Sequence, residues 1–290
     1  MKLFIISILM AIYCLPAAAQ ADTALAPVAA DSAAAKNTLT LGVSYSNNAN
    51  YYGQKAAIKI PYAALAATYK LKSGIYFSGL AYKLLNDSGA IVSAANAGAG
   101  IAFSMGKHFS ADISYNHTFY PAYSPLLQAS NPDNGSATLV YENWLSTKLT
   151  VDYAFGKTHD LFGTFGTGKQ VTLGSISKKD IVTITPSVDV VAGTQRFYQA
   201  YLTEKRLRDS LLGTVIGPIL GQPGGQETST QTTTSTQFNL LSYNFKCPLA
   251  YNRAHYLVEI AYQLSVLSNR AQSNAGQANS FLSASFYYQF

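Results

Sequence analysis

The final stretch of the chain, FLSASFYYQF at residues 281–290, alternates between two kinds of side chain. The odd-numbered positions carry mostly hydroxyl and amide side chains, whereas the even-numbered positions are apolar throughout. The apolar series comprises Leu282, Ala284, Phe286, Tyr288 and Phe290. Because successive residues of a strand point to opposite faces, this period of two predicts a β-strand with one apolar and one polar face.

The same alternation recurs along most of the sequence. Ten further segments have strand character: 38–46, 57–71, 75–85, 96–105, 109–120, 139–155, 160–173, 181–193, 238–249 and 255–267. Within the segment 181–193, Pro186 predicts a bulge or a break, because proline cannot donate a hydrogen bond to a neighbouring strand. The sequence therefore predicts an all-β fold.

Short turns alternate with longer polar loops between these segments. The predicted short turns are 72–74, 106–108, 156–159 and 251–254, and each has Lys, Arg or His within or beside it. The longer loops include 47–54, 121–136 and 194–236. This spacing is typical of barrels whose strands cross a membrane up and down, with short periplasmic turns and long outer loops. The basic residues predict that all four short turns share one side of the membrane.

The N-terminus has the features of a secretory signal peptide. A positive start at Met1-Lys2 precedes an apolar run over residues 3–15 and the small residues Ala17-Ala18-Ala19. We expect cleavage near Ala19. Residues 20–37 are rich in alanine and predict a flexible periplasmic tail, with a short helix as the alternative, before a barrel domain at 38–290.

Composition narrows the architecture further. No stretch beyond the signal reaches the roughly 18 consecutive apolar residues of a membrane helix. A mature chain in a bilayer must then be a closed barrel, because unpaired backbone groups cannot face lipid. The 20 basic and 14 acidic residues give a formal charge of +6. The basic residues are scattered, so we predict no nucleic-acid partner, and Cys247 alone in the mature chain predicts no internal disulfide.

The C-terminal strand resembles that of the outer-membrane β-barrel proteins of Gram-negative bacteria. Their last strand commonly ends in an aromatic residue, with others two and four residues upstream; Phe286, Tyr288 and Phe290 match these positions, while Ser285 stands where Gly is frequent. The resemblance implies outer-membrane localisation, lipid contact and recognition of this strand by the barrel-assembly machinery.

The eleven segments leave one strand to be found. Bacterial single-chain barrels have an even number of strands. We place the missing strand within residues 188–215, which predicts a closed antiparallel barrel of twelve strands, with ten to fourteen as the range.

Strand parity also predicts which charged side chains face the lumen. They are Asp112, Lys148, Asp152, Asp189, Lys246 and Glu259. These groups either line a narrow water-filled pore or pair with one another and plug the barrel. The function we expect is a narrow passive pore for small solutes, with loops 121–136 and 194–236 as candidate lids. A structural or partner-binding barrel without transport is the first alternative.

A lipid hydrolase is the second alternative, and it rests on His108 and Ser110. Residues two apart in a strand share a face, so an imidazole could activate the hydroxyl. However, His108 falls in a turn that we expect on the periplasmic side, and no acidic partner is evident. We therefore predict no enzyme activity and no catalytic residue. His117 lies on the apolar face and is expected at the membrane interface.

Two further types of site are not expected. The sequence 163–169 has the spacing of a phosphate-binding loop, but Gln170 replaces the hydroxyl residue that binds magnesium. The four histidines and the cysteines show no metal-ligand spacing. We therefore predict neither a cofactor nor a metal.

A closed barrel makes a simple electrophoretic prediction. Its sheet has no free edge, so we expect it to persist in SDS at room temperature and to unfold on boiling. Unheated protein should therefore migrate at a different apparent mass from the boiled sample. Identical mobility before and after boiling would contradict the closed barrel.

Overall fold

The computed structural model describes residues 36–55, 59–86, 91–120, 131–157, 159–194, 238–268 and 278–290. The predicted signal peptide at 1–19, most of the tail at 20–37 and most of the loops 121–136 and 194–236 lie outside these ranges. Within them the protein is all-β, and twelve antiparallel strands form a closed ring. No helix in the described ranges is long and apolar enough to span a membrane.

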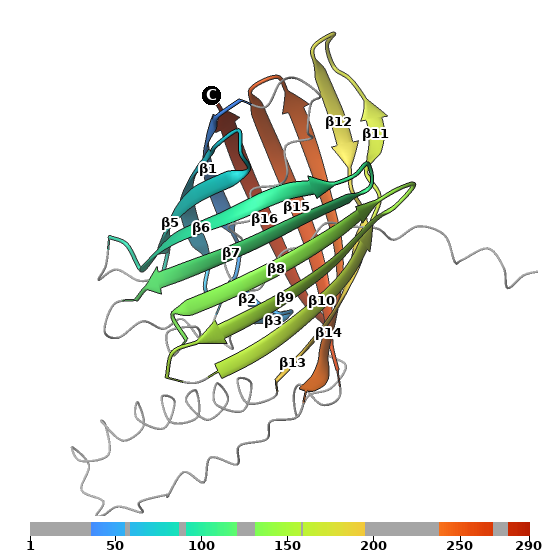
Figure 1. Cartoon of the computed structure of the whole chain (residues 1–290). Helices are drawn as coiled ribbons and strands as arrows, with labels where there is room; N and C mark the ends of the chain where they lie inside the picture. Colours follow the sequence, from blue (N-terminus) through green and yellow to red (C-terminus); the bar gives the residue numbers. More distant parts are fainter. Residues whose placement is uncertain are drawn as a thin grey trace, which may run out of the picture.

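Neighbours in the ring are mostly neighbours in the sequence (Figure 1). Its strands, in ring order, are β1 (Thr38–Ser46), β4 (Tyr62–Lys70), β5 (Ile75–Leu84), β6 (Ala94–Met105), β7 (Phe109–Phe119), β8 (Asp133–Glu142), β9 (Ser146–Phe155), β10 (His159–Gly168), β13 (Ser187–Thr194), β14 (Phe238–Arg253), β15 (Tyr256–Leu267) and β16 (Ala278–Gln289). Pairing of β1 with β16, which sets Thr40 opposite Gln289, closes the ring.

The outer face of the ring is apolar. Leu65, Phe77 and Ile113 point outward and expose 65%, 55% and 55% of their surface. In contrast, inward residues such as Asp152 and Asn244 are polar and buried. An exposed apolar belt around a polar interior is the arrangement of a transmembrane barrel. The C-terminal strand follows the predicted parity, because Leu282, Phe286 and Tyr288 are all outward and exposed.

The predicted number of twelve strands is confirmed, but the position of the missing strand was wrong. The additional strand is β8, not a segment within 188–215. The segment 139–155 is two strands, separated by a turn at Asn143–Leu145 in which the amide of Asn143 donates to the Leu145 carbonyl. This turn contains neither Gly nor Pro, so the alternation in the sequence gave no sign of it.

Because β8 was not predicted, the strands that directly follow it run in the direction opposite to the one predicted. The turns at 71–74, 106–108, 143–145 and 254–255 lie together at one end of the ring, which we call the turn end. The turn around Lys157 joins β9 to β10 at the opposite end, which we call the loop end. The prediction that this basic turn shares a side with the other three was therefore wrong. In barrels of the outer-membrane type, the end that carries the short turns is usually the periplasmic one.

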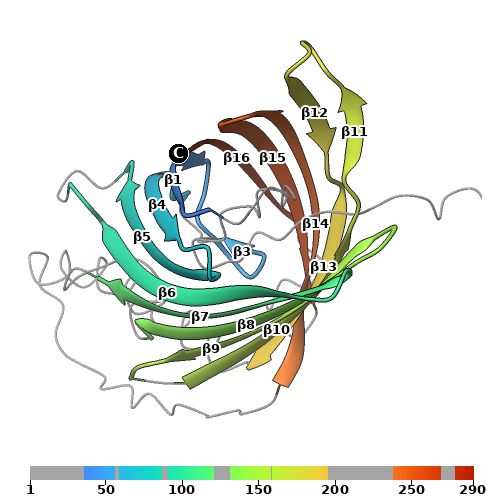
Figure 2. The same ribbon diagram turned by 45° about the horizontal axis from the view of Figure 1, so that its top comes forward.

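One hairpin stands outside the ring. Strand β11 (Val171–Gly174) pairs with β12 (Asp180–Ile184), and β12 continues into β13 after an interruption at Thr185–Pro186. Strand β12 pairs with the second half of β14. The hairpin projects beyond the turn end in both views (Figures 1 and 2). Pro186 thus marks the point where this long strand is broken, as predicted.

The tip of this hairpin is held by one carboxylate. Asp180 accepts hydrogen bonds from the amides of Ile176 and Ser177 at 2.7 and 2.9 Å, and from the Ser177 hydroxyl at 2.5 Å. The Tyr251 hydroxyl donates a further bond at 3.1 Å. Hydrogen bonds from the Ser177 side chain and backbone lower the pKa of Asp180 to about 2.

This network predicts a pH-dependent hairpin tip. Because the folded-state pKa lies below the ordinary 3.8, the carboxylate stabilises the tip above pH 3.8, and this stabilisation is lost as the pH falls toward 2. NMR titration in micelles should show the low pKa in the wild type and a higher pKa in Ser177→Ala. Ser175→Ala is the control and should leave the pKa unchanged. An ordinary pKa in the wild type would contradict the network.

Candidate functional site

A second hairpin lies inside the barrel. Strands β2 (Asn50–Tyr51) and β3 (Gln54–Lys55) belong to the connection between β1 and β4, and both views place them within the ring (Figures 1 and 2). The sequence predicted a loop at 47–54 and a strand from residue 57. The strand instead begins at Tyr62, and residues 50–55 form the inward hairpin.

The turn of this hairpin explains its local sequence. Tyr52 and Gly53 both have positive φ values, 48° and 89°, as the two central residues of a tight hairpin turn require. The side-chain oxygen of Asn50 accepts a hydrogen bond from the Gly53 amide at 3.0 Å. A side chain at Gly53 would lie within 2.9 Å of Asn244 and Ser242, so only glycine fits against the wall here.

Aromatic packing fixes the hairpin to one side of the wall. Tyr52 stacks on Phe162 of β10 with ring centroids 4.0 Å apart, and Tyr51 meets both rings edge-on at 4.9 and 6.0 Å. Val191 and Leu241 complete a buried cluster. Each such aromatic pair contributes about 0.5–1.5 kcal/mol beyond its area burial. The cluster therefore anchors the hairpin against β10, β13 and β14.

Hydrogen bonds fix the hairpin to the wall in three places. The Ser242 hydroxyl donates to the Tyr52 carbonyl at 2.7 Å, and the Asn279 amide donates to the Gly53 carbonyl at 3.0 Å. The Tyr52 hydroxyl donates to Asp152 at 3.4 Å. The anchors come from β9, β14 and β16, so the hairpin reaches across the lumen and narrows it.

All six charged residues proposed for the lumen lie on the inward face. They are Asp112 on β7, Lys148 and Asp152 on β9, Asp189 on β13, Lys246 on β14 and Glu259 on β15. The structure brings some of them together, whereas Glu259 lies apart, opposite Ala250 and Ser285. Whether they line an open pore stays a prediction.

The closest contact among them is an ion pair. Lys246 Nζ lies 2.8 Å from Asp189 Oδ2, and both side chains are almost fully buried. A side chain at Gly166, directly opposite Asp189, would collide with the carboxylate. Gly166 belongs to the segment that has the spacing of a phosphate-binding loop. Residues 163–168 of that segment lie in β10, and this glycine makes room for the ion pair.

A second group lies on the wall of β7 and β9. The Tyr76 hydroxyl donates to Asp112 at 2.9 Å. Lys148 is close enough to interact electrostatically with both Asp112 and Asp152. Asp152 in turn meets Tyr52 of the hairpin. Charges predicted from parity and a loop not predicted to enter the barrel therefore form one connected network.

The aromatic residues of the site were not predicted from the sequence. Tyr51, Tyr52 and Phe162 are buried, yet the first two were placed in an outer loop. A usable signal was present, since two consecutive bulky aromatics followed by Gly53 are unusual in a solvated loop. Such a pair indicates a turn that buries its own side chains.

The histidines outside the lumen have separate contacts. His108 Nδ1 lies 2.7 Å from the Glu142 carbonyl oxygen, in the turn-end rim, while Ser110 points inward. His117 points outward, as its parity predicted, and contacts Asp133. Among the residues described, no three His, Cys, Asp or Glu side chains are grouped so that they could hold a metal ion.

A closed ring with an apolar outside and a polar, partly filled inside defines a transmembrane β-barrel of the outer-membrane type. No protein-family model matches the chain, and no curated protein sequence matches it. Solved structures similar in fold include a KdgM porin, with 8% identity, a TM-score of 0.45, and coverage of 87% of this chain and 99% of that one.

Two other solved barrels are similar in fold. The COG4313 outer membrane channel from Pseudomonas putida F1 has 9% identity and a TM-score of 0.44, with 88% of this chain and 96% of that one covered. The outer membrane protein OprD from Pseudomonas aeruginosa has 9% identity and a TM-score of 0.34, with 87% and 65% covered.

The buried ion pair makes a stability prediction. Lys246→Met leaves Asp189 buried without its cation, so we expect a loss of about 3–5 kcal/mol in the free energy of unfolding. Adding Asp189→Asn should recover most of that loss. Urea unfolding in detergent micelles measures both. Lys157→Met, at an exposed turn, is the control and should change little; an equal effect of both lysine substitutions would contradict the role of the pair.

Proposed function

We propose that the protein is a narrow passive channel for small solutes. The observation that carries this proposal is the inward β2–β3 hairpin, held at the wall by Tyr52, Ser242 and Asn279. A barrel of twelve strands lies between eight-stranded barrels, whose interior side chains can fill, and the wider open porins. A hairpin in the lumen sets the width of whatever passage is left.

The wall of β5–β8 is the side along which we place the passage. Two of its inward side chains lie over glycines that make room for them. Asn116 lies over Gly98 and Tyr76 lies over Gly100, and a side chain at either glycine would collide with its neighbour. Ser114 follows on β7 and is also small. The hydroxyl and amide groups here suit small hydrated solutes, whereas Leu80, Tyr82 and Ala94 form an apolar cluster nearer the loop end.

The inward charges favour cationic and neutral solutes. In the described part of the barrel, the inward acidic residues are Asp112, Glu142, Asp152, Asp160, Asp189 and Glu259; the inward basic residues are Lys70, Lys148 and Lys246, and Lys55 belongs to the hairpin in the lumen. Asp189 and Lys246 pair with each other. The inward charged residues outside this pair have a net negative charge, although the whole chain has a formal charge of +6. A passage lined in this way attracts cations and repels anions.

We also propose that the barrel has no enzyme activity. The candidate nucleophile Ser110 faces the lumen, and the Nδ1 of His108 bonds to a backbone carbonyl instead. These positions do not support a nucleophile and base acting together. If the lumen is closed, the structural or partner-binding barrel becomes the better account.

Planar bilayers test the channel. We expect the wild type to show small discrete conductance steps, and Tyr52→Ala to increase the step size about twofold, because the stacked ring no longer holds the hairpin across the lumen. Tyr262→Ala, which removes an outward ring on β15, is the matched control and should leave the step size unchanged.

The reversal potential in a salt gradient should indicate cation preference, and Asp112→Asn should reduce it. A correctly folded barrel that shows no steps, in both the wild type and Tyr52→Ala, would refute the channel and leave the structural barrel.

A further inference from the structure

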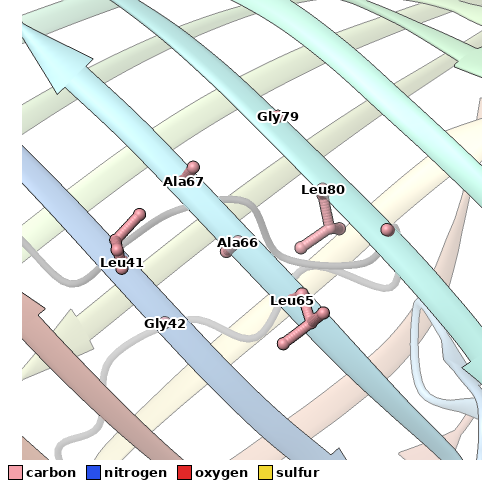
Figure 3. Close-up of a pocket in the computed structure, with 8 residues that line it drawn as sticks. Leu41, Gly42, Leu65, Ala66, Ala67, Gly79 and Leu80 are labelled. Atoms are coloured by element: carbon pink, nitrogen blue, oxygen red, sulfur yellow. The ribbon is translucent and has the colours of Figure 1, made fainter.

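The outer face of β1, β4 and β5 contains a hollow of about 450 Å³ (Figure 3). Leu41 and Leu65 stand at its sides, and Ala67, Gly79 and Ala81 have little or no side chain to fill it. Large apolar residues cover much of the outer face, and this hollow lies where Gly and Ala take their place. Hydrocarbon surrounds this face, and a hollow there is filled by an acyl chain at no cost in desolvating polar groups.

A polar cluster lies on the same outer face near the loop end. His117 Nδ1 is 2.7 Å from Asp133 Oδ1, and the Tyr115 hydroxyl donates to the same oxygen at 2.5 Å. The His117 side chain is 37% exposed. Charged groups on the lipid-facing side of a barrel are costly at mid-bilayer and tolerated at the interface. Their position indicates contact with headgroups rather than with hydrocarbon.

The cluster and the hollow share one row of the sheet. Ala67 is paired with Gly79, Gly79 with Ala97, and Ala97 with His117. The cluster therefore lies two strands from the floor of the hollow. Lys83 is also on the outer face, two residues beyond Ala81 along β5 and close to the loop end of that strand.

These groups define the chemistry of a ligand. The Asp133 carboxylate accepts from Nδ1–H of His117, so Nε2 is the nitrogen that faces a ligand, and it donates a hydrogen bond when the ring is doubly protonated. The Lys83 ammonium adds a positive charge above the hollow. An imidazolium N–H and an ammonium both recognise phosphate oxygens. The loop end faces the outer leaflet if the turn end is periplasmic.

We propose that the outer face of β4–β7 binds a phosphorylated, acylated lipid of the outer leaflet. One acyl chain lies in the hollow between Leu41 and Leu65, and a headgroup phosphate meets Lys83 and His117. This site faces the membrane and does not depend on whether the lumen conducts. It makes the barrel a specific lipid-binding protein in addition to its proposed channel activity.

The hollow can be filled without disturbing the strand. A side chain at Gly79 would meet no atom closer than 3.9 Å, and its φ is not in the left-handed region, so Gly79→Leu should fold. Gly163→Leu is the matched control, since it adds the same side chain at an outward glycine of β10, where the nearest atom is 3.6 Å away. Heat-modifiable migration confirms that each variant is folded.

The probe is lipid A, a diphosphorylated and multiply acylated lipid. Purified barrel in detergent is incubated with lipid A, and the lipid that stays bound is counted by native mass spectrometry. We expect one retained molecule for the wild type and Gly163→Leu, and about tenfold lower affinity for Gly79→Leu. Lys83→Gln with His117→Gln should abolish the preference for lipid A over its dephosphorylated form.

Competitors separate the possible sources of the phosphate. Inorganic phosphate should not displace lipid A, and phosphatidylglycerol should displace it poorly. Equal retention by Gly79→Leu and Gly163→Leu would overturn the proposal, as would full displacement by inorganic phosphate, which would indicate an anion site without a chain site. Dimers that form in the wild type and are lost in Gly79→Leu would overturn it in favour of a contact between two copies.

Discussion

The requirement that every backbone amide and carbonyl be paired where hydrocarbon surrounds the sheet governs this fold. A ring of strands meets it because the first and last strands bond to each other, with Thr40 opposite Gln289. Once the ring is closed, the side chains must divide by parity. Apolar residues such as Phe77 go outward, and polar residues such as Asn244 go inward. The polar interior is thus a consequence of the closed ring in which the backbone amides and carbonyls pair.

A polar interior of this width creates its own difficulty, since buried charges and amides need partners. The protein meets this need in two ways. Asp189 and Lys246 pair with each other on the wall, and the hairpin at 50–55 brings carbonyls and a hydroxyl to Ser242, Asn279 and Asp152. The hairpin also carries its own apolar core, because Tyr51 and Tyr52 pack on Phe162. The contacts that give the polar side chains of the wall their partners also hold the hairpin in the lumen. They therefore determine how much of the lumen stays open.

Parity in the sequence was enough to predict the class of fold and the inward direction of six charged residues, whereas the count of twelve strands also needed the even-number rule. It was enough because lipid on one side and water on the other impose a strict alternation on each strand. The places where prediction failed are those where parity carries no information. The turn at Asn143–Leu145 lacks Gly and Pro, so two strands were read as one, and the error moved the Lys157 turn to the wrong end.

The inward hairpin was missed for a related reason. Loops have no alternation, and whether a loop lies outside or folds back into the barrel depends on contacts with residues more than a hundred positions away, such as Phe162 and Ser242. Tyr51-Tyr52-Gly53 carried the only local hint. The His117–Asp133 contact was missed as well, because the pairing of β7 with β8 could not be foreseen while β8 itself was unrecognised.

The seam between β1 and β16 has a consequence for how the protein is made. Its two strands are separated by most of the sequence, so the hydrogen bonds that seal the cylinder join the earliest and the latest parts of the barrel to be synthesised. Contacts between such distant positions form slowly. Until the final strand pairs, the incomplete sheet has two edge strands whose unpaired backbone groups can bond to other chains. The last pairing of the barrel is therefore also the one that removes its open edges.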